Sequence, residues 1–84
     1  MQETAVGVVT HYYGHLGVAV VQVNTGSLRT GDRVRFKGHT TDLTLQLASM
    51  EYEHQHVDQA VPGQSVGIRV PDHVREHDIV SVVK

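Results

Sequence analysis

The sequence predicts an all-β domain, folded as a small closed six-stranded antiparallel β-barrel. Val and Thr are plentiful, apolar runs are short, and Gly or Pro recurs at intervals, a pattern typical of short strands joined by turns. No stretch keeps the i, i+3, i+4, i+7 apolar spacing over the length of a helix. Because closure removes the exposed sheet edges that invite aggregation, we expect a barrel rather than an open sandwich.

The expected strands cover residues 4–13, 18–23, 33–37, 41–52, 66–70 and 79–83. The first turn, at residues 14–17, contains two glycines that can adopt positive φ. Successive side chains of a strand point to opposite faces, so the third strand should bury Val34 and Phe36 and direct its basic residues to water.

The later strands follow the same logic. A row of leucines, Leu43, Leu45 and Leu47, forms one face of the fourth expected strand. Residues 54–64 are polar and contain Pro62-Gly63, which indicates a loop. Alternating apolar residues then form the fifth strand. The sixth is apolar on both faces, which indicates a strand that is covered on both sides or lies at a barrel seam.

Length and charge limit the function. Eighty-four residues without Cys predict a single domain, residues 1–84. Seven Lys plus Arg against nine Asp plus Glu give a net charge of −2, which argues against a general nucleic-acid binder and leaves only a local basic patch for RNA. The N-terminus has no secretory pattern, and the longest apolar run, residues 18–21, is too short to span a bilayer. We therefore expect a cytoplasmic protein with no membrane partner.

Several segments in series resemble a known family. The strings GVV at 7–9, GVAV at 17–20 and GSLRTGDRV at 26–34 precede AVPGQSVGI at 60–68 and VREHDIV at 74–80. In this order they resemble the second domain of elongation factor Tu and of other translational GTPases, and the resemblance covers nearly the whole chain. It implies a translation-factor β-barrel that contacts tRNA, ribosomal RNA or a translation-linked protein.

The chain departs from that family in its ligand motifs. It lacks the phosphate-binding G-x-x-x-x-G-K-[ST] loop, so we expect no GTP and no other nucleotide cofactor. Ser49 stands where tRNA-carrying factors have a glutamate before the methionine, and Pro71-Asp72 replaces their late Arg-Gly. The segment 38–42, GHTTD, is also similar to one in a related barrel, the C-terminal accessory domain of collagenase-like peptidases.

Four of the seven basic residues fall within nine positions, and these are Arg29, Arg33, Arg35 and Lys37. On a strand the last three project from one face about 6.5–7 Å apart, close to the spacing of successive phosphates in a nucleic-acid strand. We identify the four as the candidate binding site for RNA or an acidic partner. The alternative is a solvated outer face that only keeps the strand from pairing with neighbours.

No catalytic, metal or cofactor site is expected. His54-x-His56 and the string HVREH at 73–77 have metal-like spacings, but the second follows a proline-led turn, whereas the zinc motif needs a helix. The four serines lie in no nucleophile motif. The tyrosines Tyr12, Tyr13 and Tyr52 offer rings to a base or a peptide, or else cover the core.

Two functions therefore remain. The first is a noncatalytic, translation- or RNA-linked binding module that contacts RNA backbone or an acidic partner through the basic strand face. The alternative is a protein-interaction or accessory barrel that docks on a separately encoded enzyme or GTPase and binds no nucleic acid.

Overall fold

The computed structural model describes residues 2–84, and these form ten β-strands and no helix. The strands are β1 (Glu3–Tyr13), β2 (Val18–Val23), β3 (Leu28–Arg29), β4 (Arg33–Lys37), β5 (Asp42–Gln46), β6 (Met50–Tyr52), β7 (Gln55–Val57), β8 (Gln59–Ala60), β9 (Ser65–Arg69) and β10 (Ile79–Val83). The all-β prediction is confirmed. None of residues 2–84 belongs to a helix of the length and apolarity that a bilayer crossing requires.

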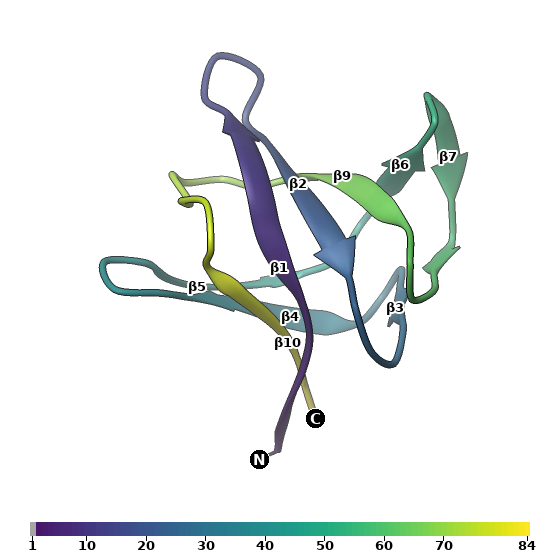
Figure 1. Ribbon diagram of the computed structural model, residues 1–84, viewed down its shortest axis with the longest axis horizontal. Helices are drawn as coiled ribbons and strands as arrows, with labels where there is room; N and C mark the ends of the chain where they lie inside the picture. Colours follow the sequence, from purple (N-terminus) through teal and green to yellow (C-terminus); the bar gives the residue numbers. More distant parts are fainter. Residues whose placement is uncertain (1) are drawn as a thin grey trace.

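Eight strands form one antiparallel sheet in the order β5-β4-β10-β1-β2-β9-β6-β7, and β3 pairs separately with β8 (Figure 1). The two ends of the chain lie together because β1 pairs with β10. Beyond these strands, Gln2 and Lys84 exchange backbone hydrogen bonds of 2.8 and 2.7 Å. The first and last residues described therefore lie side by side.

The sheet curls on itself without closing into a ring. β5 lies at one end of the sheet, and β6 is the last strand but one at the other end. Only residues 47–49 connect these two strands along the chain, so the two ends of the sheet must approach each other. Within residues 2–84, however, no ladder joins β5 to β7, and these strands remain the two ends of the sheet. The predicted closure is therefore not confirmed, and the prediction of six strands is wrong.

The expected fourth strand is divided into β5 and β6 because it changes partners. Leu47 donates to the Asp32 carbonyl at 2.8 Å and accepts from Gly31 at 2.7 Å, so β5 ends against β4. Three residues later Met50 opposite Ile68 begins a new ladder, between β6 and β9. The expected 54–64 loop contains β7 and β8, and β3 lies in an expected connection. These strands were not predicted because two or three residues are too few to show a period.

The core lies inside the curl. Val34 and Phe36 of β4 are fully buried, as predicted, and the core also includes side chains from β1, β2, β6, β9 and β10. Leu47 is buried too, whereas Leu43 and Leu45 are only half-buried against the core. Gly7 sits at a register shift in β1, where a Cβ would collide with the Gln22 carbonyl of β2, so this close approach of two strands requires glycine.

Candidate binding surfaces

The basic residues of β4 share one face with acidic partners. Arg33, Arg35 and Lys37 alternate with the buried residues of the strand and project outward, as predicted. Asp42 stands opposite Lys37 across the β4–β5 pair, and Thr44 stands opposite Arg35. We call the outward side chains of β4 and β5 the outer face.

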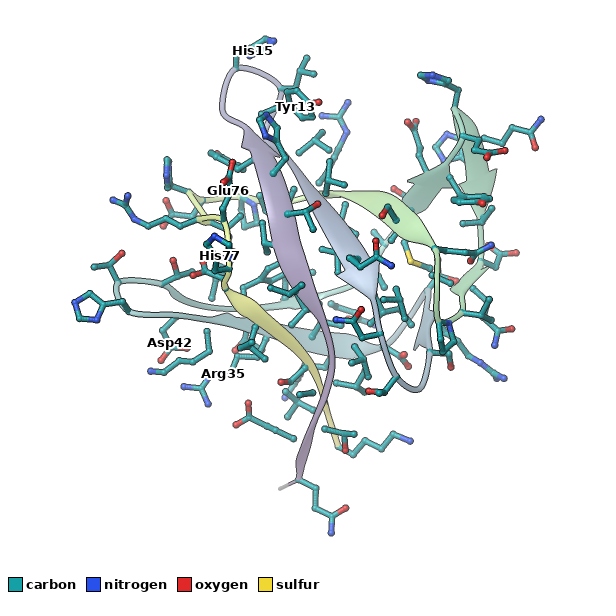
Figure 2. The ribbon with its side chains drawn as sticks, viewed as in Figure 1. Tyr13, His15, Arg35, Asp42, Glu76 and His77 are labelled. Carbon is teal, nitrogen blue, oxygen red and sulfur yellow. The ribbon has the colours of Figure 1, made fainter. Side chains whose placement is uncertain are left out.

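Arg35 is held by two carboxylates. Its Nε and Nη2 donate to Oδ1 and Oδ2 of Asp42, both at 2.8 Å; Figure 2 labels the two residues. Its Nη1 donates to Oε2 of Glu3 at 2.7 Å. The planar guanidinium matches a carboxylate in this two-point geometry. Its donors are thus directed at protein carboxylates rather than at an external phosphate.

The hydrogen bonds from Arg35, followed by that from Lys37, lower the pKa of the Asp42 carboxyl from 3.8 to about 2. The same pairing with Asp42, and then with Glu3, raises the pKa of Arg35. Asp42 therefore stays ionised far into the acid range and keeps the outer face partly neutralised.

Lys37 is also paired, because its Nζ lies 3.3 Å from Oδ2 of Asp42. Arg33 forms no ion pair with any residue from 2 to 84. The three cations of the outer face, set against its own Asp42 and the neighbouring Glu3 of β1, leave a single positive charge in excess. The face is much less basic than the sequence indicated.

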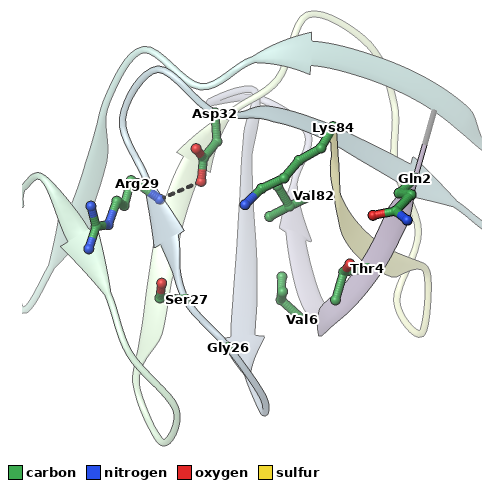
Figure 3. A pocket seen from close by; sticks show the side chains of 9 residues that line it. All are labelled: Gln2, Thr4, Val6, Gly26, Ser27, Arg29, Asp32, Val82 and Lys84. Atoms are coloured by element: carbon green, nitrogen blue, oxygen red, sulfur yellow. Dashed lines mark hydrogen bonds between the residues drawn. The ribbon is translucent and has the colours of Figure 1, made fainter.

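Arg29 lies apart from the other three candidates. It ends β3 and lines a groove of about 580 Å³ beside the joined chain ends (Figure 3). Its backbone N–H donates to Oδ2 of Asp32 at 3.0 Å. Arg29 and Lys84 both line this groove, but Figure 3 shows the Arg29 guanidinium pointing away from Lys84. Arg33 and Arg35 line a separate, smaller groove with Glu3 and Asp42. The structure thus divides the predicted site in two.

A second surface gathers aromatic and imidazole rings around the β1–β2 hairpin. The His11 and Tyr13 ring centroids are 4.3 Å apart, and Nδ1 of His11 is 3.4 Å from Oε2 of Glu76. Tyr13 is 42% exposed, and Leu16, at the hairpin tip, is 56% exposed. Figure 2 places Tyr13 and His15 at this tip, away from Arg35 and Asp42.

The other tyrosines cover the core. Tyr12, the neighbour of Tyr13 on β1, is half-buried, and its ring meets that of His73 edge-on at 4.7 Å. Tyr52 is likewise partly buried against the core. Of the three candidate rings, Tyr13 is thus the exposed one, and strand alternation explains why it and Tyr12 differ.

The histidine spacings noted in the sequence do not converge. Within residues 2–84 no three His, Cys, Asp or Glu side chains are placed to hold a metal ion. His54 has a φ of 66° at the turn between β6 and β7, and His56 lies 3.9 Å from the Glu51 carboxylate. His77 has a φ of 76° before β10, so the 73–77 string forms a turn and not a helix.

The chain shares its fold with the C-terminal domain of a putative peptidase. It superposes on the C-terminal domain of a putative U32 peptidase from Geobacillus thermoleovorans with a TM-score of 0.87 and 27% identity, over 98% of this chain and 93% of that one. No protein-family model matches the sequence.

Two curated relatives lie in different classes. The chain is 37% identical to a collagenase of Porphyromonas gingivalis over 78 residues, which is 92% of this chain and 22% of that protein. It is 36% identical to elongation factor 1-alpha of Natronomonas pharaonis over 66 residues, 74% of this chain and 15% of that protein. The chain thus spans about a fifth or less of these relatives. In fold, and over nearly its whole length, the chain is similar to the C-terminal domain of a putative U32 peptidase.

Proposed function

We propose that this chain is a noncatalytic accessory domain that docks on a peptidase of the U32 type. The observation that carries this proposal is the match over nearly the full length of both chains with the C-terminal domain of a putative U32 peptidase. The collagenase similarity, which extends over 92% of the chain, supports the same role. The sequence left open a related alternative, an accessory barrel that docks on a separately encoded enzyme or GTPase; the present proposal also includes an enzyme part in the same protein.

The charge of the outer face also supports docking over RNA binding. Sequence-independent RNA affinity grows with the number of phosphates that free cations neutralise. Here Arg35 and Lys37 already pair with carboxylates, and Arg29 lies elsewhere. Contact with RNA through this strand stays a prediction, and the similarity to elongation factor 1-alpha is the observation in its favour.

The experiment uses the P. gingivalis collagenase as the recipient. Three proteins are compared: the intact collagenase, the same protein without the matched 78 residues, and a chimera that carries this chain in their place. An accessory role predicts that the deletion loses collagen hydrolysis and that the chimera regains it. A chimera no better than the deletion, together with salt-dependent binding of tRNA by the isolated chain, would favour the RNA-linked function instead.

A further inference from the structure

The free edge of β5 has a definite hydrogen-bonding pattern. Gly38 donates to the Thr41 carbonyl and Leu47 donates to the Asp32 carbonyl, so both pairs belong to the β4–β5 ladder. Hydrogen-bonded and non-hydrogen-bonded pairs alternate in an antiparallel ladder. With the observed register, Leu43 and Leu45 must then bond to β4.

The remaining residues of β5, namely Asp42, Thr44 and Gln46, direct their backbone N–H and C=O groups to the other side. Among residues 2–84 no turn, loop or side-chain hydrogen bond reaches these groups. β5 also pairs with no strand on that side. Three alternate residues thus present an open row of donors and acceptors.

The apolar side of the same strand is incompletely covered. Leu43 and Leu45 stand opposite Phe36 and Val34, which are fully buried, yet both leucines remain partly exposed. An added strand beyond β5 would cover them with its own inward side chains. The missing backbone partners and the missing apolar cover therefore lie at one edge.

We propose that the β5 edge binds an extended segment of a partner protein as an added antiparallel or parallel strand. This mode of recognition supplies backbone hydrogen bonds for affinity and alternate side chains for specificity. The segment is apolar at every second position, to cover Leu43 and Leu45. The proposal deepens the accessory role above and rests on it for the source of the segment, which is the peptidase partner.

The charges of the outer face define the segment further. Asp42 already holds two cations, whereas Gln46 is neutral and stands opposite Arg33, which has no ion pair within residues 2–84. A side chain beside Gln46 on an added strand would project from the same face as Arg33, with only β5 between them, so an opposite charge there would attract the guanidinium. The segment therefore carries an acidic residue at that position and none beside Asp42.

A second copy of this chain fits the edge less well. Two β5 strands side by side would bring together two outer faces, each with an excess positive charge. A partner segment with an acidic residue beside Gln46 would instead neutralise Arg33. Light scattering on the isolated chain is accordingly expected to give a monomer, and a dimer lost on substitution in β5 would overturn this choice of occupant.

The direct probe is a blocked seven-residue peptide of alternating threonine and valine with a single glutamate in place of one threonine. Titration at millimolar peptide is followed by amide NMR signals. We expect the signals of Asp42, Thr44 and Gln46 to shift and their hydrogen exchange to slow. N-methylation of the peptide residues whose N–H groups face β5 should abolish binding, whereas N-methylation of the residues between them should not. Lysine in place of the glutamate should weaken binding several-fold. Absence of any change at β5 overturns the proposal.

Two variants separate the backbone contact from other effects. Thr44→Pro removes an edge-facing N–H and adds a ring there, so peptide affinity should fall at least about tenfold. Thr44→Val keeps the N–H and should bind like the original chain. If Thr44→Pro disturbs the fold, the N-methylated peptide still tests the unaltered protein.

The same variants in the collagenase chimera distinguish the two proposals. If the chimera is active and Thr44→Pro leaves it so, the edge proposal fails and the accessory role stands. If the peptide binds the β5 edge but the chimera regains nothing, the accessory role fails and the edge stands. Activity lost with Thr44→Pro and kept with Thr44→Val supports both.

Discussion

The guanidinium of Arg35 and the carboxylate of Asp42 form a two-point hydrogen bond between β4 and β5, with both distances at 2.8 Å. Asp42 is the first residue of β5 and stands diagonal to Arg35 across the ladder, because its direct opposite is Lys37. This pair, extended by Glu3 from β1, links three strands on the outer face. It converts a basic stripe into a largely neutral surface.

Acid should weaken the domain through this pair. The pKa of Asp42 is lowered in the fold from 3.8 to about 2, so the ionised form is favoured by folding. Its stabilisation is fully present above about pH 4 and is lost as the pH falls from there towards about 2. Thermal unfolding of the Asp42→Asn variant should therefore lie below that of the original chain at pH 6, and the difference should shrink towards pH 2. An equal difference at both pH values would contradict the assignment.

Releasing the cations of β4 should increase affinity for polyanions. The double variant Glu3→Gln/Asp42→Asn removes both carboxylates that hold Arg35 and Lys37. Binding of single-stranded RNA should then tighten and depend more steeply on salt, with a log–log slope larger by about 0.7 for each additional phosphate that these cations neutralise. Fluorescence anisotropy at several salt concentrations measures this slope. An unchanged slope would mean that the pairing does not mask the face.

Gly38 should resist substitution because of a buried acid. A Cβ at this position would collide with the carboxylate of Asp78, which is 4% exposed and accepts the backbone N–H of Arg75 at 2.9 Å. Overpacking of this kind costs about 1–3 kcal/mol, so Gly38→Ala should lower the free energy of unfolding by that amount. Gly14→Ala is the matched control, since its added Cβ meets nothing nearer than 3.5 Å. Urea unfolding that fails to separate the two variants would be inconsistent with the packing described.

Backbone variants of β5 should follow the alternation of its ladder. With the observed register Leu45 donates its N–H to β4, so Leu45→Pro removes a ladder hydrogen bond and should cost about 1–3 kcal/mol for the acceptor left without a partner. Thr44 donates towards the open edge, so Thr44→Pro should cost clearly less. Native-state hydrogen exchange offers a check without substitution, because the amides of Leu43 and Leu45 should exchange slowly and that of Thr44 quickly. Equal protection along the strand would contradict the register.

Alternation in the sequence was sufficient to predict the longer strands. β1, β2, β4, β9 and β10 lie within a residue or so of the expected ranges, since each shows an apolar period or run over at least five residues. β3, β7 and β8 have two or three residues, too few for a period to appear. The break between β5 and β6 escaped prediction because the row from Leu43 to Leu47 continues smoothly and only the change of partner ends the strand.

The outward direction of three candidate residues was predicted, but their pairing with carboxylates and the separation of Arg29 were not. The strand period placed Arg33, Arg35 and Lys37 on one face, and the structure agrees. Their neutralisation depends on Asp42 and Glu3, whose positions follow from the register of β5 and from strand order. The position of Asp42, five residues after Lys37 and just beyond the turn at Gly38, could have indicated an ion pair across a hairpin. Glu3 is 32 residues from Arg35 and gave none.

Collagen hydrolysis by the P. gingivalis chimera tests the accessory role most directly. The matched segment is 78 residues, and this chain replaces it in the chimera. We predict that the chimera recovers most of the activity that the deletion loses, while the isolated chain hydrolyses nothing. A stable, correctly folded chimera with no more activity than the deletion would contradict the account.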